Sequence, residues 1–182
     1  ISACLVGSEM CIRDRSCSAG KTAQRRLIRQ QSRSEKIIFA AENGVIMVKI
    51  ITGNKGSGKT KILIDMINAA SQNTDGYVVC IDKSDKLRYD IPHSVRIVDT
   101  DVYRIYSFEA FFGLVAGLVA GNYDIKDIFV DSILKVGGAD YDALGALLAK
   151  IDKLTGNDVN VVFTVSADKA DLPESVTKYA IK

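Results

Sequence analysis

Eight consecutive residues carry the clearest chemical signal in the chain: Gly53-Asn54-Lys55-Gly56-Ser57-Gly58-Lys59-Thr60. Glycines at this spacing let successive backbone N–H groups converge on one oxyanion, and a helix that starts there adds its partial positive charge. Lys59 adds a full positive charge, and Thr60 adds a hydroxyl that can bind a divalent cation. The segment therefore predicts a site for a phosphate group and a metal ion.

The spacing of these residues is the Walker A pattern, G-x-x-x-x-G-K-[ST]. We expect the loop from Gly53 to Thr60 to cradle the phosphates of a nucleotide, Lys59 to reach the β- and γ-phosphates as a catalytic cation, and Thr60 to bind Mg²⁺. The alternative is a glycine-rich turn with no ligand. The context favours a phosphate loop, because an apolar strand at residues 48–52 precedes it and a periodic helix at residues 59–71 follows it.

A metal-binding acid is expected at the end of another strand near the loop, and Asp131 follows the apolar run IFV of residues 128–130. As the Walker B residue, Asp131 would hold Mg²⁺ through its water shell and serve catalysis. Asp82, at the end of the second strand, and Asp99 and Asp101, after the third, are the alternative acids.

Strand-like and helix-like segments alternate from residue 47 onward, which indicates βα units around a mainly parallel sheet. The predicted fold class is α/β, with three layers, about five strands and helices on both faces. The helix at residues 59–71 has apolar residues at three- and four-residue spacing, so one of its faces should pack on the sheet. The expected strands are residues 48–52, 77–81, 95–98, 125–131 and 160–165, and the expected helices are residues 59–71, 107–120, 140–154 and a short one after Pro173.

With these motifs the chain resembles the P-loop NTPase superfamily, and that resemblance implies its fold and Mg-ATP binding. Over residues 47–182 the chain is also similar to a small, uncharacterised bacterial family of ATP-binding proteins, which brings no known reaction. Some members of that family carry a pilus-retraction label, but such motors need histidine boxes that the lone His93 cannot build. We interpret His93, beside Pro92 in a polar turn, as a solvated loop residue.

Two expected strands separate the Walker A and Walker B strands along the chain, which resembles the RecA-like branch. In that branch another strand lies between these two in the sheet, and a polar residue at the end of the next strand senses the γ-phosphate. Thr164 and Ser166 are the candidates, although ordinary strand-end polarity explains them equally well. The branch usually places a catalytic glutamate after the Walker B aspartate, where this chain has Ser132, with Glu109 and Asp127 as weak substitutes.

ATP and Mg²⁺ are the expected ligands, and the missing glutamate favours a slow ATPase or a nucleotide-dependent switch that acts through a partner protein. A small nucleoside or metabolite kinase is the first alternative, but beyond residue 46 the chain has only Arg88, Arg96 and Arg104, so no arginine-rich lid is visible. A non-hydrolysing ATP-binding scaffold is the second alternative. A GTPase is disfavoured, because the DKSD sequence of residues 82–85 precedes Asp131, and Asp131 itself does not begin a D-x-x-G, since residues 131–134 read DSIL.

Three glycines, Gly113, Gly117 and Gly121, lie four residues apart in the helical segment that begins at residue 107. Glycine costs about 1 kcal/mol per helix position relative to alanine, so three of them suggest that another backbone approaches this face. Tight packing against the sheet is the first interpretation. Self-association through this face, by small-xxx-small contacts, is the second.

Composition and charge limit the function classes. The chain is 47% hydrophobic and 25% charged, which fits one soluble domain, and its longest uncharged apolar run, residues 110–121, is too short to span a membrane. Residues 47–182 hold 16 Lys+Arg and 18 Asp+Glu, a balance that does not support nucleic-acid binding. Cys80, in the apolar run YVVC, is expected to be a buried thiol without chemistry. We predict a cytoplasmic protein.

The first 46 residues are interpreted as a non-native leader, disordered or poorly packed. Residues 9–15 read EMCIRDR, which resembles the translation of a transposon-end sequencing adapter, and residues 16–46 would then be upstream DNA or the tail of another frame. The leader holds 8 Lys+Arg and 4 Asp+Glu, and a basic arm at residues 25–36 is the functional alternative. Its Gly20-Lys21-Thr22 lacks the first glycine and the strand of a phosphate loop. The expected native domain is residues 47–182, a single nucleotide-binding domain.

Overall fold

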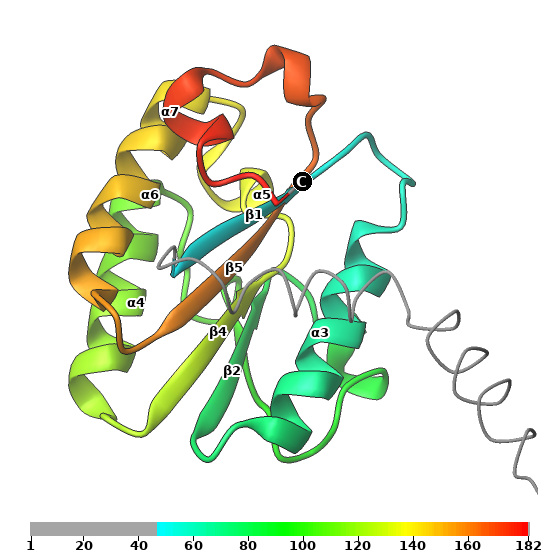
Figure 1. Ribbon diagram of the computed structural model, residues 1–182, viewed down its shortest axis with the longest axis vertical. Coiled ribbons are helices and arrows are strands. Elements are labelled where there is room, and N and C mark those ends of the chain that lie inside the picture. The colour runs from blue at the N-terminus through cyan, green and yellow to red at the C-terminus, as the bar shows by residue number, and fades with distance from the viewer. Residues whose placement is uncertain (1–46, 182) are drawn as a thin grey trace, which may run out of the picture. The chain divides into compact units, whose positions relative to one another are not determined.

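The structure of the chain is a computed structural model that describes residues 47–181 (Figure 1). The predicted leader, with its adapter-like string and its basic arm, lies outside the described residues, as does Lys182. From β1 onward, strands alternate with helices in the order β1-α3-β2-β3-α4-β4-α5-α6-β5-α7, with two short 3-10 helices, η1 and η2.

The five strands form one fully parallel sheet with the order β1-β5-β4-β2-β3. β5 is therefore inserted between β1 and β4, as predicted, with Val161 of β5 opposite Val48 on one side and Ile128 on the other. The C-terminus adds an isolated parallel bridge between Ile50 and Ala180. The strands are β1 (Val48–Thr52), β2 (Tyr77–Asp82), β3 (Arg96–Asp99), β4 (Ile125–Val130) and β5 (Asn160–Val165).

Helices cover both faces of this sheet, which confirms the predicted three-layer α/β fold. One face packs against α3 and η1, and the other packs against α4, α6 and α7 (Figure 1). No helix within residues 47–181 has the length and apolar character needed to cross a bilayer. The helices are α3 (Lys59–Asn73), η1 (Asp85–Tyr89), α4 (Phe108–Gly121), α5 (Leu134–Gly137), α6 (Tyr141–Thr155), η2 (Lys169–Asp171) and α7 (Glu174–Thr177).

The strands alternate their side chains between two apolar layers. In β2, Val79 and Ile81 lie in the layer with α4 and α6, whereas Val78 and Cys80 lie in the layer with α3. Because both faces of a parallel sheet are buried, such strands read as continuous apolar runs in the sequence. This burial makes the sheet a fixed platform for the loops that leave its carboxyl edge.

The predicted strands and long helices are all present, with boundaries that shift by one or two residues. Two of the shifts come from helix caps: Ser107 accepts a hydrogen bond from the Ala110 N–H at 3.1 Å, and Asp140 accepts one from the Ala143 N–H at 3.0 Å. These residues therefore precede α4 and α6 instead of belonging to them. The short helix α5 was not predicted, because one turn gives no readable periodicity.

The predicted packing of Gly113, Gly117 and Gly121 against the sheet is wrong. All three glycines are exposed on α4, and a Cβ built at any of them would have no neighbour within 4 Å. The face of α4 that packs on the sheet carries Phe111 and Val115 instead. Self-association through the glycine face stays a prediction.

Candidate functional site

A cavity of about 560 Å³ opens at the carboxyl ends of β1, β5 and β4, and we call it the loop cavity. Its walls come from the glycine loop (residues 53–60), the segment that follows β4, and the end of β5. Ligands of open α/β sheets bind at this edge, outside the carboxyl ends of the strands. The lining residues are Lys55, Gly56, Gly58, Lys59, Thr60, Asp131, Ser132, Leu134, Lys135 and Ser166.

The glycine loop folds around the amine of Lys59. Gly56 and Gly58 have φ angles of +87° and +81°, which lie in the left-handed region that favours glycine. Lys59 Nζ donates hydrogen bonds to the carbonyl oxygens of Gly53 at 2.8 Å and Asn54 at 2.9 Å. Burial lowers the pKa of Lys59, and the nearby charge of Asp131 opposes that shift. The loop thus holds a cation at its centre, at the first turn of α3.

Asp131 follows β4 directly and is only 6% exposed. Its Oδ1 accepts a hydrogen bond from Thr164 Oγ1 at 2.8 Å and a longer one from Thr60 Oγ1 at 3.4 Å. Its Oδ2 accepts one from Ser132 Oγ at 2.9 Å. The structure therefore brings together three residues that the sequence singled out from three separate segments: Thr60, Asp131 and Thr164.

Ser132, which stands where the resemblance called for a glutamate, has a left-handed backbone with φ of +51°. This conformation is unfavourable for a residue other than glycine. A hydrogen bond from its N–H to Thr164 Oγ1, at 2.7 Å, helps to hold it. Thr164 is fully buried and uses its hydroxyl both as donor to Asp131 and as acceptor from Ser132. Ser166, the other candidate sensor, is exposed and lines the loop cavity.

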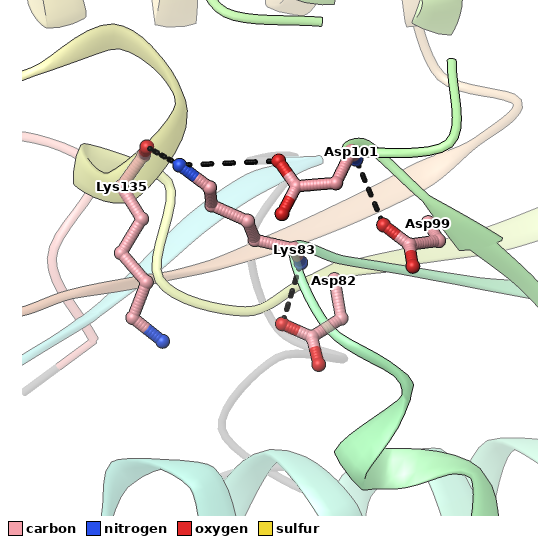
Figure 2. Close-up of polar contacts among 5 residues, drawn as sticks. All are labelled: Asp82, Lys83, Asp99, Asp101 and Lys135. Carbon is pink, nitrogen blue, oxygen red and sulfur yellow. Dashed lines mark hydrogen bonds and ion pairs between the residues drawn. The ribbon is translucent and has the colours of Figure 1, made fainter. Parts of the chain in front are cut away.

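The alternative acids lie at the end of β2 (Asp82), at the end of β3 (Asp99) and in the turn that follows β3 (Asp101) (Figure 2). Asp82 is buried and accepts hydrogen bonds from the Lys83 N–H at 2.7 Å and from Ser84 Oγ at 3.2 Å. Burial raises the pKa of Asp82, and the charge of Asp131 raises it further, against the effect of the Lys83 hydrogen bond. Asp99 accepts a hydrogen bond from the Asp101 N–H at 2.8 Å. Asp82, Asp99 and Asp101 do not line the loop cavity, whereas Asp131 does.

Lys83 joins the segment after β4 to the loop after β3 (Figure 2). Its Nζ donates to the carbonyl oxygen of Lys135 at 3.1 Å and lies 4.0 Å from Asp101 Oδ1. The same amine lies 5.9 Å from the centre of the Tyr106 ring. The sequence predicts no role for either lysine: Lys83 enters only through the disfavoured GTPase interpretation of residues 82–85, and Lys135 belongs to no motif. The only available signal was that Lys135 follows Asp131 by four residues.

The two weak substitutes for a catalytic base lie away from the loop cavity. Glu109 is exposed in the first turn of α4 and does not line the cavity. Asp127 lies four residues before Asp131 along β4, a separation of about 13 Å in an extended strand. Neither is placed to activate a water there.

Two residues that we expected to be inert have the expected surroundings. Cys80 is fully buried, and burial raises the pKa of its thiol to about 12, so little of the reactive thiolate forms near neutral pH. His93 is exposed in the turn before β3.

Comparison with known proteins adds little to this geometry. No protein-family model matches the chain, and no curated protein matches its sequence. Among solved structures, PCH-2 from C. elegans is similar to this chain, with a TM-score of 0.48 and 17% sequence identity, and the similarity covers 89% of this chain. The chain spans 39% of the length of that protein. Function therefore has to be inferred from the residues of this chain.

Proposed function

We propose that the chain is a Mg-ATP-binding P-loop protein of the RecA-like branch, which works in the cytoplasm as a slow ATPase or a nucleotide-dependent switch. The observation that carries this proposal is the convergence of Lys59, Thr60, Asp131 and Thr164 at one sheet edge, with β5 inserted between β1 and β4. In this proposal the glycine loop from Gly53 to Thr60 holds the phosphates with its backbone N–H groups.

Lys59 is the proposed cation for the β- and γ-phosphates. Its amine already lies inside the loop, held by the carbonyl oxygens of Gly53 and Asn54. Phosphate oxygens at the same place would be alternative acceptors, so the side chain needs little reorganisation. A fixed positive charge stabilises the charge that develops on the transferred phosphoryl group. Lys55 and Lys135, which line the same cavity, would add to this field.

Thr60 and Asp131 fit a Mg²⁺ site. They offer two oxygen ligands, 3.4 Å apart, beside the lysine that would face the phosphates. Mg²⁺ is usually held by one or two protein oxygens, and phosphate oxygens and waters complete its shell. When bound, the ion would neutralise part of the phosphate charge. Thr164 and Ser132 fix the Asp131 carboxylate, so it would keep its position as the ligands arrive.

Slow turnover is proposed because the site offers no free general base. Asp131 is the one carboxylate among the described residues that line the loop cavity, and the proposed metal role uses it. The hydroxyl of Ser132 is a poor base at neutral pH, and it donates to Asp131. The attacking water would therefore depend on a group supplied by a partner protein, which suits a switch.

A small nucleoside or metabolite kinase is the second candidate, and one observation favours it. Three lysines, Lys55, Lys59 and Lys135, line a single cavity, and no arginine is among its described lining residues. Cations around the transferred group are what phosphoryl transfer to an acceptor requires. A non-hydrolysing ATP-binding scaffold is the candidate that fits if no turnover is found with any acceptor.

The test is Mg-ATP binding and phosphate release by the full chain and two variants. We expect Lys59→Ala to weaken Mg-ATP binding at least about tenfold, because the phosphates lose their fixed cation. Lys61→Ala, which removes an exposed amine from the same helix, is the matched control and should bind as the parent does. Asp131→Asn should lose Mg-dependent affinity while retaining weak ATP binding in EDTA.

Unchanged Mg-ATP affinity in Lys59→Ala would refute the phosphate-loop assignment. Unchanged Mg²⁺ dependence in Asp131→Asn would refute the metal assignment alone. Phosphate release that disappears in Lys59→Ala would support an ATPase. Binding without release in the parent would support the partner-dependent switch, and a kinase would then be tested with nucleoside acceptors.

A further inference from the structure

A second cavity, of about 330 Å³, lies against the amino-terminal half of the sheet, between α3 and strands β1, β5 and β4. It shares no lining residue with the loop cavity. Its floor and wall are apolar where Met66, Phe129 and Val162 face it, and these residues belong to the core layer on the α3 side. Three polar side chains, Lys49, Asp127 and Asn160, complete the lining from the strands.

The strands place opposite charges on this cavity without letting them pair. Lys49 lies opposite Val162 in the β1–β5 register, and Asp127 lies opposite Asn160 in the β4–β5 register. Lys49 is level with Phe129 across the sheet, so Asp127 lies two strands away and two residues along, about 12 Å between the two backbones. Within residues 47–181, Lys49 has the charge of Asp127 as an electrostatic neighbour but no hydrogen bond or ion pair.

Both charges are partly removed from water. Asp127 is 9% exposed and accepts two hydrogen bonds, from Thr74 Oγ1 at 2.8 Å and from Asn160 Nδ2 at 3.3 Å. A carboxylate has about four acceptor positions, so Asp127 can accept more. Lys49 is half-buried, and this burial lowers the pKa of its amine. A desolvated charge without a close partner is unfavourable, and a ligand that carries the complementary charges would offset that cost.

We propose that this cavity binds an α-amino acid with an apolar side chain. The carboxylate of the amino acid faces Lys49, its ammonium group faces Asp127, and its side chain packs on Met66 and Phe129. The volume of the cavity is roughly ten times that of a water molecule, which is enough for one such amino acid. A nucleotide phosphate is disfavoured here, because the negative charge of Asp127 shares the cavity.

The helix α3 connects this cavity to the loop cavity. It begins at Lys59, in the glycine loop, and its last turns, with Met66, Asn73 and the following Thr74, line the second cavity. An amino acid in this cavity would therefore contact the carboxyl-terminal half of α3, the helix that starts at the proposed phosphate site. Binding of the amino acid itself does not depend on the proposed ATP function.

The test is titration of the full ¹⁵N-labelled chain with L-leucine, followed by amide chemical shifts. We expect saturable shifts around Lys49, Asp127 and the end of α3. N-acetyl-L-leucine, which lacks the ammonium group, and L-leucinamide, which lacks the carboxylate, should each bind at least about tenfold more weakly. Lys49→Met should have the same effect, whereas Lys59→Ala should bind L-leucine as the parent does.

A cavity-filling variant, Ala69→Phe, tests the site without removing either charge. Ala69 lines the cavity, and a phenyl ring there should abolish the leucine shifts in a chain that stays folded. The proposal fails if leucine causes no saturable shifts up to its solubility limit, or if the shifts fall on the loop cavity. It also fails if N-acetyl-L-leucine binds as well as L-leucine, or if Lys49→Met has no effect.

Discussion

Asp131 has both carboxylate oxygens engaged in the structure. Thr164 and Thr60 donate to Oδ1, and Ser132 donates to Oδ2. The contact to Thr60 is the longest of the three, at 3.4 Å, so it is the contact that these residues would give up at least cost if they held Mg²⁺. The two shorter bonds would then keep the carboxylate aimed at the ion. At the scale of single residues, the candidate site is built around one fixed acid.

Thr164 is the residue whose removal should disturb this arrangement most. Thr164→Val keeps the shape of the side chain but removes the donor to Asp131 and the acceptor for the Ser132 N–H. We expect the free energy of unfolding to fall by about 1–3 kcal/mol, because both partners lose a hydrogen bond. Denaturant unfolding measures this change. Thr164→Ser retains the hydroxyl and should recover most of the loss; equal losses in the two variants would mean that packing, not hydrogen bonding, matters here.

The type and order of the helices and strands are easier to predict from the sequence than the face of each helix that is buried. Helices α3 and α6 show clear three- and four-residue apolar spacing, and the strands show continuous apolar runs, so type and order could be read from sequence. The α4 segment is apolar or small at almost every position, so its periodicity could not show which face is buried. The sequence therefore favours packing of the three glycines on the sheet, whereas the structure places them on the exposed face of α4. The same ambiguity hid α5, a single turn.

Adding one methyl group should have opposite effects on stability at an exposed glycine, Gly117, and at a glycine packed against the core, Gly137. Gly117→Ala should stabilise the protein by about 0.5–1 kcal/mol, because the site is an exposed helix interior with no atom near the new Cβ. Gly137→Ala should destabilise it by about 1–3 kcal/mol, because its Cβ would collide with the ring of Phe108, a core residue. Thermal unfolding of both variants measures this contrast. If Gly117→Ala instead lowers the melting temperature, another part of the protein contacts this face of α4. If the variant also forms smaller oligomers than the parent, that contact is self-association.

At the scale of the molecule, the residues of the candidate site that could be predicted from the sequence are those in one continuous motif or at the end of a strand. Lys59, Thr60, Asp131 and Thr164 each follow from such a local signal, and the insertion of β5 between β1 and β4 followed from the expected branch. Lys83 could not be found in this way, because its contact to Lys135 joins residues 52 positions apart through the sheet order. The second cavity was hidden for the same reason, since Lys49 and Asp127 face it from strands that are not neighbours.

The domain boundary at residue 47 is the remaining proposal at this scale, and a shortened chain of residues 47–182 tests it. Both faces of the five-stranded sheet are covered by helices that lie between residues 59 and 177, and β1 pairs along its whole length with β5. A domain of this size can hold its own core. We therefore expect the shortened chain to unfold cooperatively, within a few degrees of the melting temperature of the full chain, and to bind Mg-ATP with the same affinity. Loss of cooperative unfolding, or a large fall in melting temperature, would show that residues 1–46 belong to the fold.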